Sequence, residues 1–223
     1  MAATLAQRVQ DLIGFDYSDN SINTENEALE TACAEIIDLA PTALLLKYAV
    51  APYNLVSGST TINISGKKIL RVIRYDTLNS VGRLCEKVDL DEWFLLTSDT
   101  NSIYYPTDHS PVYTENRDTL EVFPAVTGSI DGADSAKVFY IIYPTGDNID
   151  SATSISGLPN ELEHAVALKA SIYILQTLIS DTVQDDEDEE LLAMYNNQMQ
   201  SLQGMYQAEI QRITGEDEPQ TGD

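Results

Sequence analysis

The spacing of apolar residues changes twice along the chain, and this change constrains the fold more than any other feature. In residues 1–55 the apolar side chains recur at helical intervals, as in Leu5, Val9 and Leu12 before Gly14. Residues 56–150 are instead rich in β-branched side chains, and residues 151–213 return to helical spacing. The sequence therefore predicts an α+β fold. Helices from the two ends form the core, and a small antiparallel β-sheet or barrel is inserted between them.

The N-terminal segment predicts three helices. Thr24 and Glu27 have the spacing of a capping box for the second helix, and Pro41 is expected to end it. A short third helix is expected within residues 41–50. The predicted apolar face of the second helix consists of Leu29, Ala32, Cys33, Ile36 and Ile37.

The middle segment predicts four to six strands. The runs "STTINIS" and "KKILRVIRY" flank a Ser-Gly turn, and "PVYTENRDTLEVFP" predicts a hairpin that turns at residues 116–118. The run "AKVFYIIYP" is apolar enough to be a central strand. Loops are expected between these strands, and one of them would contain Trp93.

The C-terminal segment predicts a long helical hairpin. Its first helix is expected to open at Leu158 and Pro159, and its second follows the acidic run Asp185, Asp186, Glu187, Asp188, Glu189 and Glu190. Residues 214–223 are predicted to be an acidic, disordered tail. A heptad-like seam on the second helix either packs inside the hairpin or docks on a partner. It consists of Leu192, Tyr195, Met199, Leu202 and Tyr206.

Charge excludes several classes of partner. The chain has 36 acidic and 12 basic residues, a net charge of −24, which argues against free binding to nucleic acid or to an anionic membrane. Half of the basic residues lie in residues 67–87, and this asymmetry is a first hint of function; the alternative is that they belong to ordinary solvated strand edges. These residues are Lys67, Lys68, Arg71, Arg74, Arg83 and Lys87.

No pattern typical of catalysis or of cofactor binding is present. His109 and His164 have no second ligand at metal-binding spacing, and phosphate-binding glycine loops and nucleophile elbows are absent. We therefore expect no enzyme, no cofactor and no metal. Cys33 and Cys85 are predicted to be free thiols. The 12 tyrosines favour a protein that assembles with others, since tyrosine is enriched in interfaces.

The order of these parts resembles that of head–tail connector (adaptor) proteins of tailed bacteriophages. The resemblance is carried by "PVY…LEVFP…VFYIIYP…GLPNELEHAVALKASIYIL", followed by an acidic last helix that contains Tyr and Met. It covers residues 20–212. The most specific element is the pattern L-P-x-x-L-x-x-A, which opens a long helix after a strand that ends in Tyr-Pro.

The resemblance implies a structural virion protein rather than an enzyme. It implies a homo-oligomeric ring, typically twelvefold, located in the virion neck after assembly in the host cytoplasm. The ring would lie beneath the portal protein, join a downstream neck or tail protein, and let DNA pass without specific binding. The basic residues at 67–87 would then meet a neighbouring subunit or the portal, and the acidic run would face the channel or the solvent. The alternatives are a tail-completion or tail-terminator ring, and a monomeric acidic inhibitor that mimics DNA.

Overall fold

A computed structural model describes residues 3–14, 22–57, 61–76, 81–128, 134–145, 149, 152–155, 157–184 and 189–215. The chain divides into two compact units. The first combines residues 1–45 with residues 143–223, and the second consists of residues 46–142. The expected insertion of a middle segment between two helical ends is thus present, with boundaries about ten residues earlier than the sequence predicts. No helix among the described residues is long and apolar enough to cross a membrane.

The first unit is helical, and both ends of the chain build it. The helix α1 begins after a capping box in which the Thr4 side chain accepts from the Gln7 backbone, and it ends at Gly14, whose φ of 83° favours glycine. The helix α1 spans Leu5–Ile13. The described residues of this unit also form α2 (Ile22–Leu39), α3 (Thr42–Leu45), α5 (Asn160–Gln184) and α6 (Glu189–Thr214).

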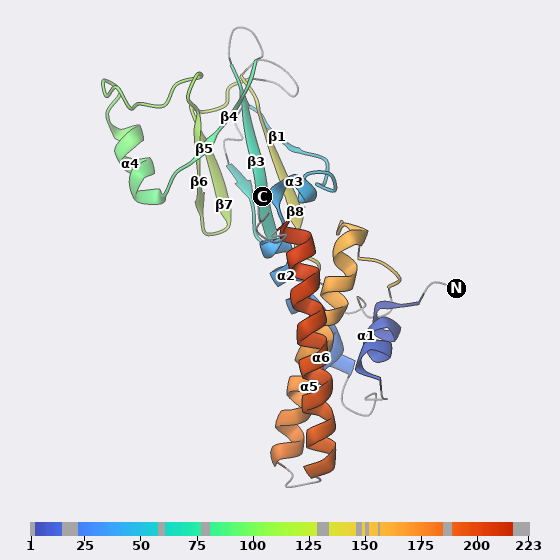
Figure 1. Ribbon diagram of the computed structural model, residues 1–223. Coiled ribbons are helices and arrows are strands. Elements are labelled where there is room, and N and C mark those ends of the chain that lie inside the picture. Colours follow the sequence, from blue (N-terminus) through green and yellow to red (C-terminus); the bar gives the residue numbers. More distant parts are fainter. Residues whose placement is uncertain are drawn as a thin grey trace, which may run out of the picture. The chain divides into compact units, whose positions relative to one another are not determined.

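Helix α5 is the centre of this unit. It packs against α1, α2 and α6, and Figure 1 shows α5 and α6 side by side over much of their length. Most residues between 162 and 175 of α5 are buried, on several sides of the helix, because small residues such as Ala165, Ala170 and Ser171 let neighbouring helices approach. The guanidinium of Arg212, near the end of α6, donates to the Glu161 carbonyl at the start of α5, so the hairpin is antiparallel as predicted.

The second unit is a sandwich of two four-stranded sheets. The first sheet has the order β1-β8-β3-β4 and the second has the order β2-β7-β6-β5. All pairs are antiparallel except β5 with β6. The strands are β1 (Tyr53–Leu55), β2 (Thr61–Asn63), β3 (Lys67–Tyr75), β4 (Gly82–Leu84), β5 (Glu86–Lys87), β6 (Val112–Asn116), β7 (Thr119–Phe123) and β8 (Ala136–Ile142).

The core of the second unit lies between its two sheets. Val72 and Val138 of the first sheet pack in one cluster with Leu120 and Val122 of the second. The predicted hairpin is confirmed as β6 and β7, and the predicted central strand as β8, which lies between β1 and β3.

Three structural predictions are wrong in detail. The described residues form eight strands rather than four to six, because several pairings involve only two or three residues, too short for a periodicity signal. The helix α2 begins at Ile22, so Thr24 lies inside it rather than at its cap. Trp93 lies not in a loop but in a helix, α4 (Leu90–Ser98), which is part of the second unit.

Candidate interaction surfaces

The described residues form no group of three or more His, Cys, Asp and Glu that could hold a metal ion. His109 lies in an exposed loop, where its backbone N–H donates to Thr107, and His164 is exposed on α5. A groove between α2 and α5 encloses about 180 Å³, below the range typical of ligand pockets.

Only part of the predicted acidic run can be placed. Asp185, Asp186, Glu187 and Asp188 lie outside the described residues. Glu189 and Glu190 are exposed in the first turn of α6, where carboxylates stabilise the positive end of the helix dipole. These two residues therefore act at least as helix-terminal charges, whatever else the run does.

The predicted basic residues are divided between the surface and the interior. Arg71 is exposed, whereas Lys67 and Lys68 are half-buried. The Lys67 ammonium lies 5.7 Å from the centre of the Tyr140 ring. Lys87 forms a 2.8 Å ion pair with Glu115 on the surface of its own unit. Arg83 is half-buried on β4, directly opposite Arg74 in the first sheet.

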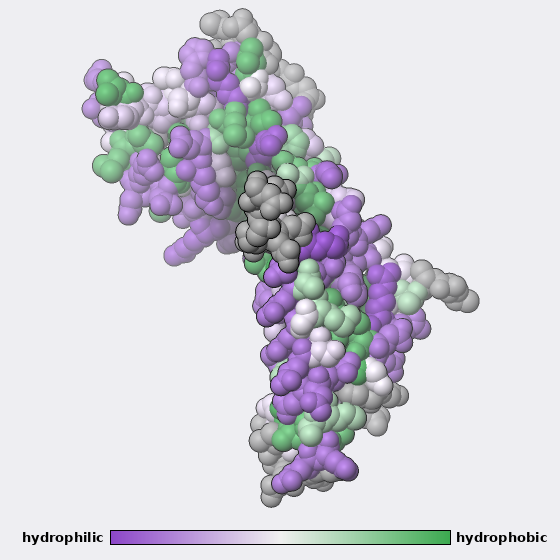
Figure 2. All heavy atoms as spheres, in the orientation of Figure 1, coloured by the Kyte–Doolittle hydropathy of each residue, from purple (hydrophilic) through white to green (hydrophobic). Residues whose placement is uncertain are grey.

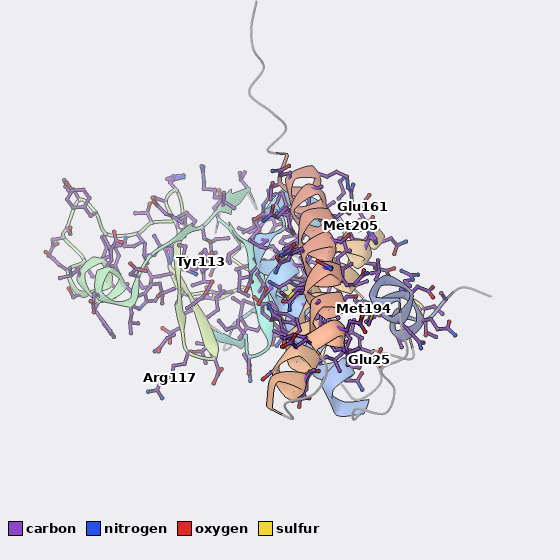
Figure 3. The ribbon with its side chains drawn as sticks, turned by 60° about the horizontal axis from the view of Figure 1, so that its bottom comes forward. Glu25, Tyr113, Arg117, Glu161, Met194 and Met205 are labelled. Atoms are coloured by element: carbon purple, nitrogen blue, oxygen red, sulfur yellow. The ribbon has the colours of Figure 1, made fainter. Side chains whose placement is uncertain are left out.

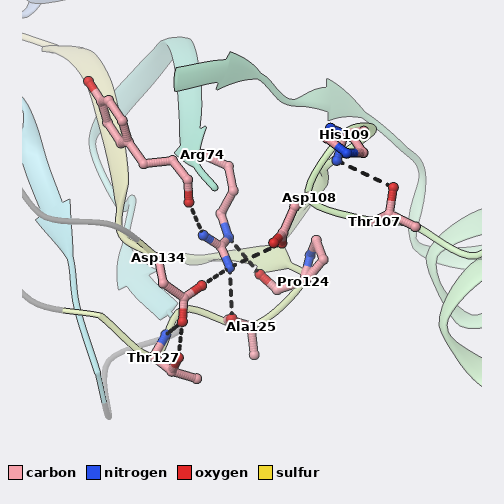
Figure 4. A network of polar contacts seen from close by, with 9 residues as sticks. Arg74, Thr107, Asp108, His109, Pro124, Ala125, Thr127 and Asp134 are labelled. Carbon is pink, nitrogen blue, oxygen red and sulfur yellow. Dashed lines mark hydrogen bonds and ion pairs between the residues drawn. The ribbon is translucent and has the colours of Figure 1, made fainter. Parts of the chain in front are cut away.

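Arg74 contradicts the prediction that it contacts a partner, because its side chain is 1% exposed (Figure 4). Its guanidinium donates to the carbonyls of Pro124, at 3.0 Å, and Ala125, at 3.2 Å, and it pairs with the carboxylate of Asp134. The other oxygen of Asp134 accepts from the Thr127 backbone at 3.0 Å. Arg74 therefore links β3 to two later segments inside one unit. Alternation along β3 turns it inward, which its basic character conceals in the sequence.

Two of the five residues of the predicted seam on α6 are buried. Tyr195 and Leu202 are buried on α6, which packs against α5, and Leu192, Met199 and Tyr206 are half-buried. Two other methionines of α6, Met194 and Met205, are each 45% exposed (Figure 3). For Tyr195 and Leu202 the intramolecular interpretation therefore holds.

A polar network joins α2, α5 and α6. The Lys169 ammonium lies 3.0 Å from the Glu35 carboxylate, which also accepts from the Tyr173 hydroxyl. The same ammonium lies over the rings of Tyr173 and Tyr206, at 4.9 and 5.2 Å. Burial alone would raise the pKa of Glu35, but the hydrogen bonds from Tyr173 and Lys169 outweigh it, and the net pKa is below its usual value of 4.5.

This network predicts a pH dependence of stability on the acid side. Because the folded-state pKa of Glu35 is lowered, its stabilising contribution is complete above 4.5 and is lost as pH falls through the folded-state value. We expect the difference in urea midpoint between wild type and Glu35→Gln, followed by far-ultraviolet circular dichroism, to shrink steadily below that pH. A difference that stays constant down to strongly acidic pH would contradict this account.

Both cysteines are free, as predicted, and both are buried. Burial raises the pKa of each thiol, Cys33 and Cys85, from 9.0 to about 12. The negative charge of Glu30 raises the pKa of Cys33 further, by a smaller effect. Neither thiol is exposed as a reactive cysteine is, although nearby Arg74 partly offsets the effect of burial on the pKa of Cys85.

Native protein at pH 8 should therefore react very slowly with an aromatic disulfide reagent. A pKa of about 12 lowers the thiolate fraction at that pH by about a thousandfold relative to a pKa of 9. We expect both thiols to react promptly only after unfolding in guanidinium. Rapid labelling of one thiol in the native protein would show that its surroundings open readily.

The sequence missed one surface, the outward side of α4. Phe94 and Leu95 are 62% and 75% exposed, although the helix also contributes the buried Trp93. The signal was present, since Asp89 precedes an apolar segment that has Asp91 and Glu92 in its first turn, a typical helix start.

Comparison with models of known protein families and with curated protein sequences found no match to this chain.

Proposed function

We propose that the chain is a structural protein of a tailed-phage neck, a homo-oligomeric ring beneath the portal that extends the DNA channel and joins head to tail. Twelvefold symmetry is the arrangement that the resemblance favours. The portal protein and a downstream neck or tail protein are the proposed partners, and DNA passes through without specific binding. The role is assembly rather than catalysis.

The observation that carries the proposal is the architecture of the first unit. Residues 1–45 and 143–223 together build one helical body, and the β-rich residues 46–142 are inserted between them. The resemblance to connector proteins implies this order of parts. The antiparallel α5–α6 hairpin favours a connector over a tail-terminator ring, for which a sheet-dominated fold without such a hairpin is expected.

Charge supplies a physical reason why such a ring would be acidic. DNA carries one negative charge per about 1.7 Å of its axis, so a basic channel would bind it through counterion release, whereas an acidic channel lets it slide. With a net charge of −24, this chain suits the acidic case. We assign the acidic run 185–190 to the channel. The rival role is a solvated surface that keeps unassembled subunits apart.

The two roles of the acidic run can be separated by replacing residues 185–190 with serine. The channel assignment predicts slower DNA ejection from particles that assemble normally. A control replaces Glu216, Asp217 and Glu218, in the C-terminal segment of this chain, with serine. This control should leave DNA ejection unchanged. Normal packaging and ejection with the six-residue replacement would reject the channel assignment.

Five of the six basic residues stay proposed contacts with a neighbouring subunit or with the portal. They are Lys67, Lys68, Arg71, Arg83 and Lys87, and Arg74 is excluded by its burial.

A phage genome that lacks the gene for this chain provides the functional test. The proposal predicts filled heads that carry the portal but fail to join tails, and that regain infectivity when purified protein is added to the extract. Deletion particles with normally attached tails would contradict the proposal.

A further inference from the structure

Helix α4 is apolar on two sides, and only one side is covered. Trp93 packs edge-on against Phe123 with ring centres 6.0 Å apart, in a cluster with Val88 and Val112. On the other side Phe94 and Leu95 are mostly exposed. Contiguous exposed apolar residues commonly mark an interaction site, so this side is expected to be covered in the assembled state.

The loop after α4 extends this apolar surface. The Tyr105 ring also packs edge-on against Phe123, with ring centres 5.4 Å apart. The loop is therefore held beside the same ring as α4. In that loop Ile103 is 89% exposed and Tyr104 is 73% exposed. Figure 2 shows green, hydrophobic spheres at the left of the view, where Figure 1 draws α4 and the loop that follows it. The α4 patch is defined as Phe94, Leu95, Ile103 and Tyr104.

The surroundings of the α4 patch are acidic. Asp91, Glu92 and Asp99 are exposed beside it, and the sequence has no Lys or Arg from residue 88 to residue 116. A partner that covers the patch must therefore combine apolar side chains with positive charge, since carboxylates facing carboxylates would oppose association.

The first sheet of the same unit has that complementary chemistry. Its four strands contain six Lys and Arg residues and no Asp or Glu, in a chain with 36 acidic residues. Along β3, Val72 and Arg74 point into the core, so Arg71 and Ile73 lie on the opposite, outer side. The strand register places Ile73 beside both Leu84 and Lys137, and Arg71 beside Phe139.

This outer side is also apolar and accessible. Leu84 is 66% exposed and Arg71 is exposed, whereas Ile73 and Phe139 are half-buried. The outer sheet face is defined as Arg71, Ile73, Leu84, Lys137 and Phe139. It presents apolar side chains between positive charges, and the α4 patch presents apolar side chains between negative charges.

We propose that the α4 patch of one copy of this chain docks on the outer sheet face of a second copy. The two surfaces differ, so the contact is head-to-tail, and each added copy leaves one surface of each kind available. Such a contact propagates into a ring or a filament, and it gives the proposed ring function its inter-subunit contact. That the contacts close into a ring rests on the proposed function. The contact between two copies does not rest on it.

A charge exchange tests the contact in solution. One variant, Arg71→Glu with Lys137→Glu, makes both surfaces acidic; the other, Asp91→Lys with Glu92→Lys, makes both basic. Sedimentation velocity over a concentration series should show that wild type self-associates and that each variant alone does so at least about tenfold more weakly. An equimolar mixture should recover wild-type association to within about threefold, because every contact in an alternating chain is again between opposite charges.

The control is Lys47→Glu with Arg117→Glu, which changes net charge by the same amount as the first variant at exposed positions outside both surfaces. It should associate like wild type. Three results would each overturn the contact. Wild type could stay monomeric to about 1 mM, the variants could associate as strongly as wild type, or the mixture could associate no more strongly than either variant alone.

Cross-linking identifies the surfaces directly. Because Cys33 and Cys85 are buried, Leu95→Cys and Leu84→Cys each add one exposed thiol. A short bifunctional maleimide should link the two variants when they are mixed, and should link neither to itself. Dimers of Leu95→Cys alone would replace the proposal with an α4-to-α4 contact. A ring found in particles without the mixed cross-link would leave the neck function standing and reject this contact.

Discussion

Arg74→Met is expected to lower the free energy of unfolding by about 3–5 kcal/mol, the cost of breaking a buried ion pair by removing one partner. Methionine fills much of the volume but donates no hydrogen bond. The carboxylate of Asp134, which belongs to a residue 7% exposed, would lose its positive partner, and the carbonyls of Pro124 and Ala125 would lose their donor. Three segments that converge on one guanidinium would then be held by packing alone.

The measurement is urea unfolding followed by tryptophan fluorescence. Trp93 is the only tryptophan and lies in the same unit as Arg74, so its signal reports that unit. Lys87→Met is the matched control, because it removes an ion pair whose lysine side chain is 54% exposed and should cost less than about 1 kcal/mol. Equal effects of the two substitutions would mean that the buried network contributes no more than a surface pair.

Leu168→Ala is expected to lower the free energy of unfolding by about 2–5 kcal/mol through loss of buried apolar surface and creation of a cavity. Leu168 lies in the middle of α5, is 0% exposed, and belongs to the helix on which α1, α2 and α6 pack. Alanine is the best helix former, so the substitution tests packing rather than helix propensity.

Far-ultraviolet circular dichroism during urea unfolding checks this prediction, since the long helices dominate the signal. The exposed residue Gln176 supplies the control in the same helix. Gln176→Ala should change stability by less than about 0.5 kcal/mol. If Leu168→Ala were as mild as Gln176→Ala, α5 would not be the packing centre of the helical unit.

The sequence predicted elements whose periodicity extends over many residues. The five apolar positions of α2 are all buried, the β6–β7 hairpin forms where its turn residues lie, and β8 is a central strand. Each depends on local rules of spacing and turn chemistry, which the sequence displays directly. The insertion of a β-rich unit between helical ends followed from the same rules applied segment by segment.

The remaining features depend on contacts between distant residues. Arg74 is indistinguishable from Arg71 by composition, and only the pairing of β3 with its neighbours places one inside and the other outside. The parallel pairing of β5 with β6 joins two short segments that lie far apart in the sequence. Helix α4 had a start signal, but nine residues are too few for a secure periodicity.

The most direct test of the proposed neck function is to quantify this chain against the major capsid protein in purified phage particles. The account predicts a copy number near that of a single ring, with the chain lost from heads arrested before neck assembly. Absence of the chain from the particles would contradict the account and favour the alternative of a monomeric acidic inhibitor.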